Sequence, residues 1–282
     1  MSRIADYLSL VKFEHSVFAL PFVLSAAFIH AGGLPTAWQL GWMIVAAVSV
    51  RTAAMAFNRV IDREMDALNP RTRERELPTG RVRVSKAWAL TALCSALFVL
   101  AAAMLNRVCL VLAFPALVVL LGYSYTKRFT AWCHVALGLS LGIAPMGAWL
   151  AVKPTFDIPP MALSLAVICW VAGFDIIYAL LDEDFDRAHG IHSAVVSLGR
   201  RGALQVSSAL HAAFVVLVVL FGWLTGMGAL YYAAVGIVAA VLIVEHAIVS
   251  PDDLSRVNAA FFTANGVASL LILVGVSLEV FL

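Results

Sequence analysis

The segment Trp38–Asn58, WQLGWMIVAAVSVRTAAMAFN, is apolar throughout except for Arg51 and a few uncharged polar residues. A helix of about 20 such residues crosses the roughly 30 Å hydrocarbon core of a bilayer. The segment continues without a break into an acidic cluster, NRVIDREMD, at Asn58–Asp66. Carboxylates at the end of a membrane span predict polar chemistry at the membrane boundary.

The composition of the whole chain agrees with this first segment. Of its 282 residues, 62% are hydrophobic and only 13% are charged, whereas soluble domains carry about 25% charged residues. This composition predicts an integral membrane protein in contact with lipid. It gives no reason to expect a nucleic-acid partner, and it leaves the oligomeric state open.

Apolar runs long enough to cross the bilayer occur in nine places, if the first is extended toward Leu10. We therefore predict an all-α integral membrane fold with nine transmembrane helices in a single domain, residues 1–282. The predicted spans are Ser16–Ala31, Trp38–Asn58, Ala87–Leu105, Cys109–Tyr125, Ala131–Val152, Met161–Leu181, Ala203–Leu224, Leu230–Val249 and Val257–Leu282.

The basic residues predict the orientation of these spans. If the N-terminus is cytoplasmic, 16 of the 19 Lys and Arg residues fall on the cytoplasmic side. Only Arg107 and Lys153 fall outside, and Arg51 lies within a span. Cytoplasmic loops carry an excess of Lys and Arg, so we expect a cytoplasmic N-terminus and an outside C-terminus.

A second acidic cluster, DIIYALLDEDFD, occupies Asp175–Asp186 at the end of the sixth predicted span. Both clusters open the long links of the chain, and four predicted helices separate them. This regularity predicts acidic loops at residues 58–86 and 182–202 on the cytoplasmic side, and it fits an internal duplication.

The spacing within both clusters is typical of a divalent-cation site. Asp62 and Asp66 are four residues apart, as are Asp182 and Asp186, so each pair shares one helix face. Mg²⁺ takes one or two carboxylates together with substrate phosphate oxygens. We expect these four aspartates to be catalytic and to hold Mg²⁺. Asn58 and Tyr178 lie one turn before the two pairs and are expected to bind substrate.

Basic residues beside the clusters predict an anionic substrate. Arg71 and Arg75 lie in a loop bounded by Pro70 and Gly80. Arginine matches phosphate oxygens in charge and geometry. We expect both arginines to bind a diphosphate, with Lys127 and Arg128 adding positive charge at the next cytoplasmic link.

Several polar residues in or near the spans have two interpretations. Asp175 lies on the same helix face as Tyr178 and is predicted to be catalytic. An ion pair between Arg51 and Asp175 that only holds two helices together would account for both intramembrane charges equally well. We interpret Glu245 and His246 as a cytoplasmic helix end. For Asn258 and Asn265 on the last span we favour interhelical hydrogen bonds over ligand binding.

The motifs together resemble those of the UbiA superfamily of intramembrane prenyltransferases. The resemblance covers most of the chain and rests on four motifs: Asn58-xxx-Asp62-xxx-Asp66, the loop ending Leu77-Pro78-Thr79-Gly80, Tyr123–Arg128, and Asp175-xx-Tyr178-xxx-Asp182-xxx-Asp186. It implies a nine-helix bundle around a central cavity, capped by the two acidic loops. It also implies Mg²⁺-dependent transfer of a prenyl chain from a polyprenyl diphosphate to an acceptor that is usually aromatic.

The resemblance assigns further roles and shows one departure. The commonest first motif has Asp after Asn, and here Arg59 stands there. In the family's pattern Tyr123 contributes to the substrate site, Lys127 faces the diphosphate and Arg128 is suited to an acceptor carboxylate. The Asn-Arg form resembles the 4-hydroxybenzoate polyprenyltransferases of quinone biosynthesis, which would place the chain in a bacterial inner membrane.

The acceptor stays open at this point. Some proteins with these motifs look more like the enzymes that prenylate a dihydroxynaphthoate in menaquinone biosynthesis, and haem O synthase is another member with a different acceptor. A transporter is a more distant alternative, because intramembrane charges also mark ion pathways. However, transporters are expected to carry acidic residues near the bilayer centre, whereas these clusters lie at one membrane face.

Overall fold

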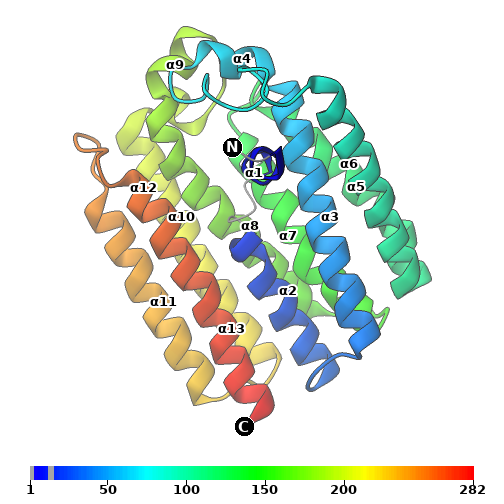
Figure 1. The fold of residues 1–282 in the computed structure, drawn as a ribbon. Helices are drawn as coiled ribbons and strands as arrows, with labels where there is room; N and C mark the ends of the chain where they lie inside the picture. Colours follow the sequence, from blue (N-terminus) through cyan, green and yellow to red (C-terminus); the bar gives the residue numbers. More distant parts are fainter. Residues whose placement is uncertain (1–2, 12–15) are drawn as a thin grey trace. The chain divides into compact units, whose positions relative to one another are not determined.

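The computed structural model describes residues 3–11 and 16–282, and this part of the chain is helical without strands. The all-α prediction is therefore confirmed. Lys12, one of the basic residues used for the orientation, lies outside the described residues. The helices form two compact units: residues 1–16 with 37–125, and residues 17–36 with 126–282. Figure 1 shows their order along the chain.

The first unit is built around two long apolar helices that pack on each other, α3 and α5. The short helix α4 follows α3 after a one-residue break at Asp62. The predicted loop between α4 and α5 is confirmed, and Gly80 within it has the positive φ of 74° that glycine tolerates best. The helices of this unit are α1 (Arg3–Leu10), α3 (Ala37–Ile61), α4 (Arg63–Leu68), α5 (Val84–Leu105) and α6 (Arg107–Thr126).

The second unit is organised around α8, which packs against α7 and α10, while α11 packs against α13. Its helices are α2 (Ser16–Ala31), α7 (Cys133–Val152), α8 (Ile158–Ala179), the 3₁₀ turn η2 (Leu180–Asp182), α9 (Glu183–Ala188), α10 (Ala194–Leu224), α11 (Ala229–Ile248), α12 (Val257–Ala259), the π-helical turn η3 (Ala260–Ala264) and α13 (Asn265–Phe281).

Small residues let the helices around α8 approach closely, as is common where membrane helices pack. A methyl group at Gly138 of α7 would lie 2.5 Å from the carbonyl oxygen of Ile168. A methyl group at Gly173 of α8 would lie 2.4 Å from the ring of His211. Both glycines are therefore required by packing, and they hold α7 and α10 against the helix that leads to the second acidic cluster.

The link from α7 to α8 is fixed by Asp157. Its carboxylate accepts hydrogen bonds from Trp149 Nε1 and from Thr155 Oγ1, both at 2.8 Å. These two bonds stabilise the ionised form and lower the pKa of the Asp157 carboxyl. The side chain that precedes α8 is thus anchored to the end of α7.

Eight described helices are long and apolar enough to cross a membrane. They correspond to eight of the nine predicted spans. The remaining one is α2, a shorter apolar helix of 16 residues. The chain is thus an integral, multi-pass membrane protein. The ninth crossing, the orientation, the central cavity and the internal duplication stay predictions.

Glu245 lies in the last turn of α11, as its interpretation as a helix end expected, but it is not at the surface. Glu245 is fully buried on α11, and its Oε1 accepts a hydrogen bond of 2.8 Å from Asn265 Nδ2. The interhelical hydrogen bond expected of Asn265 is thereby confirmed. The same amide group lies 3.1 Å from the Phe261 carbonyl oxygen, a group that the π-helical turn leaves outside the regular α-helical pattern.

Asn265→Ala is expected to destabilise the protein by roughly 1–3 kcal/mol, because it leaves a buried carboxyl oxygen without its donor. The change should lower the thermal unfolding midpoint of the purified protein in detergent, followed by tryptophan fluorescence. Asn258→Ala is the matched control, since Asn258 is exposed on the same segment. Equal midpoints for the two variants would contradict a structural role for the Glu245–Asn265 bond.

Candidate active site

The first acidic cluster keeps the helical register expected from its spacing. The amide of Asp62 bonds to the Asn58 carbonyl at 2.9 Å, and that of Asp66 bonds to the Asp62 carbonyl at 2.7 Å. Asn58 Nδ2 donates to Asp62 Oδ2 at 3.0 Å and to Ser124 Oγ at 3.4 Å. The contact to Ser124 brings the end of α6, where Tyr123 lies, to the Asn58 side of the cluster.

The loop between α4 and α5, residues 69–83, is called the arginine loop below, and it folds back onto Asp66. Arg75 Nη1 lies 2.7 Å from Asp66 Oδ1, and Thr72 Oγ1 donates to the Asp66 carbonyl oxygen at 3.0 Å. The Asp66 side chain is 8% exposed, and its second oxygen, Oδ2, is buried without a hydrogen-bond partner. A buried carboxylate oxygen in this state is suited to a cation.

The acids of the second cluster divide into two groups. Glu183 is committed to structure, because it forms ion pairs with Arg187 at 3.1 Å and with Arg200 at 2.5 Å, which tie α9 to α10. Asp182 ends η2 and precedes α9, and Asp186 is buried on α9. Asp184 is exposed. Of the two predicted metal ligands, Asp182 is thus partly buried and Asp186 is buried.

Asp175 has a partner that the sequence did not reveal. His134 Nδ1 of α7 lies 2.7 Å from Asp175 Oδ2. His134 Nε2 accepts the backbone N–H of Ala194 at 3.2 Å, so that nitrogen carries no proton and Nδ1 is the donor to Asp175. The imidazole therefore connects Asp175 to the first turn of α10. The two residues are 41 positions apart, and no spacing rule links them.

Tyr178 lies against an aromatic side chain from the last span. Its ring centroid is 4.4 Å from that of Phe261 in the π-helical turn η3, and Phe261 also contacts Phe174 at 5.2 Å. The contact with Phe261 restricts the Tyr178 ring, which lies one helical turn before Asp182. The sequence pattern singled out Tyr178 as a substrate-binding candidate but gave no sign of its contact with Phe261.

The remaining predicted residues lie nearer the surface. Arg71 and Arg128 are exposed, whereas Tyr123 and Lys127 are partly buried. The Lys127 carbonyl accepts the amide of His192 at 2.8 Å, which joins this turn to the link after α9. Among the residues that the structure describes, no group of three or more His, Cys, Asp or Glu side chains is arranged to hold a metal ion.

The apolar helices with their two aspartate clusters define an integral membrane enzyme of the intramembrane prenyltransferase class. Residues 19–267 match the model of the UbiA prenyltransferase family. The chain belongs to that family, as its sequence motifs predicted, and the transporter alternative is not supported.

Proteins of known name align with this chain over most of its length. It is 29% identical over 281 residues to a 4-hydroxybenzoate octaprenyltransferase of Cronobacter sakazakii, covering 99% of this chain and 96% of the relative. A protein of the same name from Citrobacter koseri is 30% identical over 250 residues, covering 89% of this chain and 86% of the relative.

Solved structures show the same fold. An apo UbiA homolog from Aeropyrum pernix K1 superposes with a TM-score of 0.86 at 35% identity, covering 94% of this chain and 98% of that one. A UbiA homolog from Archaeoglobus fulgidus bound to DMAPP and Mg²⁺ superposes with a TM-score of 0.71 at 19% identity, covering 95% and 99%.

Proposed function

We propose that this enzyme transfers a polyprenyl chain from a polyprenyl diphosphate to an aromatic acid such as 4-hydroxybenzoate, in quinone biosynthesis. The names of the similar proteins support this acceptor. The observation that carries the proposal is the buried Asp66 carboxylate beside Arg75. It supports the proposal because Asp66, taken as a cation ligand, and Arg75, taken as a phosphate-binding group, lie 2.7 Å apart.

The cations in this proposal are Mg²⁺ ions, one set of ligands being Asp62 and Asp66 and the other Asp182 and Asp186. Asp66 fits this role because its oxygen Oδ2 is buried without a hydrogen-bond donor. When bound, the cations neutralise the diphosphate and make it a better leaving group. The Archaeoglobus fulgidus homolog with DMAPP and Mg²⁺ supports the choice of metal.

The chain's own polar side chains bind and orient the substrate in this proposal. Asn58 fixes one oxygen of Asp62, so that the other oxygen faces a defined direction. Arg71, Arg75 and Lys127 contact diphosphate oxygens. The apolar helices keep water from the allylic cation formed when the diphosphate leaves, because water would quench it.

Aromatic and acidic residues complete the proposed substrate site. Tyr178 lies four residues before Asp182, and Tyr123 precedes Ser124, which accepts a hydrogen bond from Asn58; both tyrosines are assigned to substrate binding. Asp175, oriented by His134, takes part in catalysis by receiving the proton that the acceptor ring loses. We place the active site on the cytoplasmic side of a bacterial inner membrane, in line with the distribution of Lys and Arg.

Purified protein with Mg²⁺ and a polyprenyl diphosphate is expected to prenylate 4-hydroxybenzoate when acceptors are offered one at a time and products are followed by mass spectrometry. A dihydroxynaphthoate is the second acceptor to test, since the Asn-Arg form of the first motif fits both subgroups. No product with any aromatic acid would contradict the proposal.

Arg128→Gln is expected to raise the KM for the aromatic acid by about tenfold or more, because the carboxylate loses its charged partner. The KM for the polyprenyl diphosphate should change little. Arg201→Gln is a matched control on an exposed arginine of the same unit. If Arg128→Gln leaves the KM for the acid unchanged, the assignment of Arg128 to the acceptor is wrong.

A further inference from the structure

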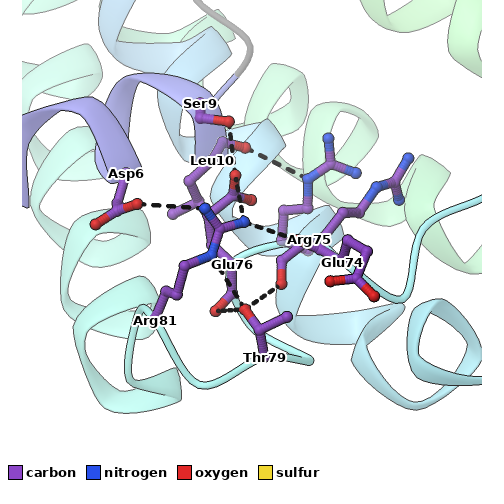
Figure 2. Close-up of polar contacts among 9 residues, drawn as sticks. Asp6, Ser9, Leu10, Glu74, Arg75, Glu76, Thr79 and Arg81 are labelled. Atoms are coloured by element: carbon purple, nitrogen blue, oxygen red, sulfur yellow. Dashed lines mark hydrogen bonds and ion pairs between the residues drawn. The ribbon is translucent and has the colours of Figure 1, made fainter. Parts of the chain in front are cut away.

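The N-terminal helix α1 is attached to the arginine loop by polar contacts (Figure 2). Ser9 Oγ donates to Glu76 Oε1 at 2.6 Å, and Asp6 Oδ1 lies 3.5 Å from Arg81 Nη1. Arg81 in turn lies 3.8 Å from Glu76 and donates to the Glu74 carbonyl at 2.7 Å. One short helix thus contacts the loop at two points, and Arg81 connects them.

Apolar packing reinforces this attachment. Leu10 at the end of α1 is fully buried in a cluster with Leu77 and Val82 of the loop and Ala87 of α5. Tyr7 of α1 packs against the same cluster. Burial of a leucine side chain is favourable, so α1 is held to the loop by more than its surface ion pairs.

Arg59 joins the same helix to α3. It is only 5% exposed, and its Nε donates to the Leu10 carbonyl oxygen at 3.4 Å. That carbonyl belongs to the last turn of α1, where a positive charge is favourable. Arg59 directly follows Asn58 and lies three residues before Asp62. The residue that departs from the family's first motif is therefore a buried cation between α1 and the aspartate cluster.

We propose that α1 is a strap that fixes the arginine loop, and that Arg59 and Glu76 are positioning residues for the Arg75–Asp66 pair. Glu76 directly follows Arg75 in the chain, so the bond from Ser9 to Glu76 restricts where Arg75 can lie. Arg59 contacts the end of α1 through the Leu10 carbonyl oxygen. The consequence for catalysis rests on the proposed function, because it takes Arg75 as a diphosphate ligand.

Trypsin tests the strap directly, because the loop contains Arg73, Arg75 and Arg81 as cleavage sites. In nanodiscs, Glu76→Ala is expected to raise the rate of cleavage within residues 71–81 by about threefold or more. Ser9→Ala, a mild change at an exposed hydroxyl, should raise it in the same direction. Glu76→Gln keeps an oxygen that accepts from Ser9 and should restore slow cleavage.

Glu74→Ala is the matched control. Glu74 lies two residues before Glu76, but its side chain is 82% exposed and pairs with Arg73 at 3.7 Å, while Arg81 uses only its backbone carbonyl. Cleavage of Glu74→Ala should therefore match the wild type. If Glu76→Ala and Ser9→Ala are also cleaved at the wild-type rate, α1 does not hold the loop and the proposal fails.

Arg59→Met should give the same fast cleavage as Glu76→Ala. In steady-state assays, both variants are expected to raise the KM for the polyprenyl diphosphate about fivefold or more, with a smaller change in kcat, since they weaken ground-state binding. Fast cleavage with an unchanged KM would confirm the strap but overturn its positioning role.

The cleavage assay also separates this proposal from the proposed function. It needs no substrate, so it stays informative even if the wild-type protein prenylates no aromatic acid. If the wild-type protein is inactive but Glu76→Ala is cleaved faster, the strap stands and the assigned reaction is wrong. If the wild-type protein prenylates the acceptor, and the variants have the wild-type cleavage rate and the wild-type KM, the strap proposal is wrong and the proposed function is unaffected.

Discussion

Asp62→Ala and Asp182→Ala are each expected to reduce turnover to less than about 1% of the wild-type rate, because each removes a ligand of the proposed cation. In the first cluster, Asn58 already orients Asp62 through a hydrogen bond of 3.0 Å. Alanine leaves that amide without its acceptor and removes one negative charge. The rate of prenyl transfer with saturating Mg²⁺ and both substrates is the measurement.

Each cluster supplies its own control. Glu64 lies two residues after Asp62, and Asp184 lies two residues after Asp182, and both are exposed. Glu64→Ala and Asp184→Ala remove the same charge at nearly the same place and should retain most activity. If Asp62→Ala or Asp182→Ala keeps near-full activity, that cluster does not hold an essential cation.

Chelation of divalent cations is expected to abolish prenyl transfer, and added Mg²⁺ should restore it. The physical reason is that a diphosphate leaves poorly while its negative charge is uncompensated. Asp66→Asn should require a higher Mg²⁺ concentration for half-maximal rate, because the amide is a weaker cation ligand than a carboxylate. Titration of the rate with Mg²⁺ after treatment with EDTA measures both effects.

EDTA saturated with Mg²⁺ beforehand is the control for direct effects of the chelator, and it should leave the rate unchanged. Full activity of the wild-type protein in excess EDTA would show that the reaction does not depend on a divalent cation. An Asp66→Asn variant with the wild-type Mg²⁺ requirement would remove Asp66 from the set of ligands, without affecting the assignment of the other aspartates.

The helices could be predicted well from the sequence because membrane spans are continuous apolar runs. The segment predicted as Cys109–Tyr125 became α6, Arg107–Thr126. The largest boundary error is at α10, which begins at Ala194 rather than Ala203. The backbone is not helical at Gly199 (φ 69°, ψ 169°), so a short helical stretch before the kink belongs to α10 although it lies outside the apolar run, and hydropathy does not detect it.

The site could be predicted where it depends on local spacing. Asp62 and Asp66 share a helix face because the backbone bonds expected for residues four apart are present. The pair between Arg75 and Asp66 was not predicted, although the two residues are only nine positions apart, because it depends on how the loop after α4 folds. Contacts between distant segments could not be predicted. His134 was missed because its partner Asp175 lies on another helix. The burial of Glu245 was missed because it depends on packing between α11 and α13.

The contact between Arg75 and Asp66 has a consequence for the order in which ligands bind. Before a metal arrives, the guanidinium balances the charge of a carboxylate that is almost out of water. In the proposed function, a cation held at Asp66 Oδ2 would compensate the same carboxylate and leave more of the Arg75 positive charge for a phosphate group of the substrate. Metal and diphosphate should therefore bind cooperatively, and by linkage each should raise the affinity for the other by the same factor.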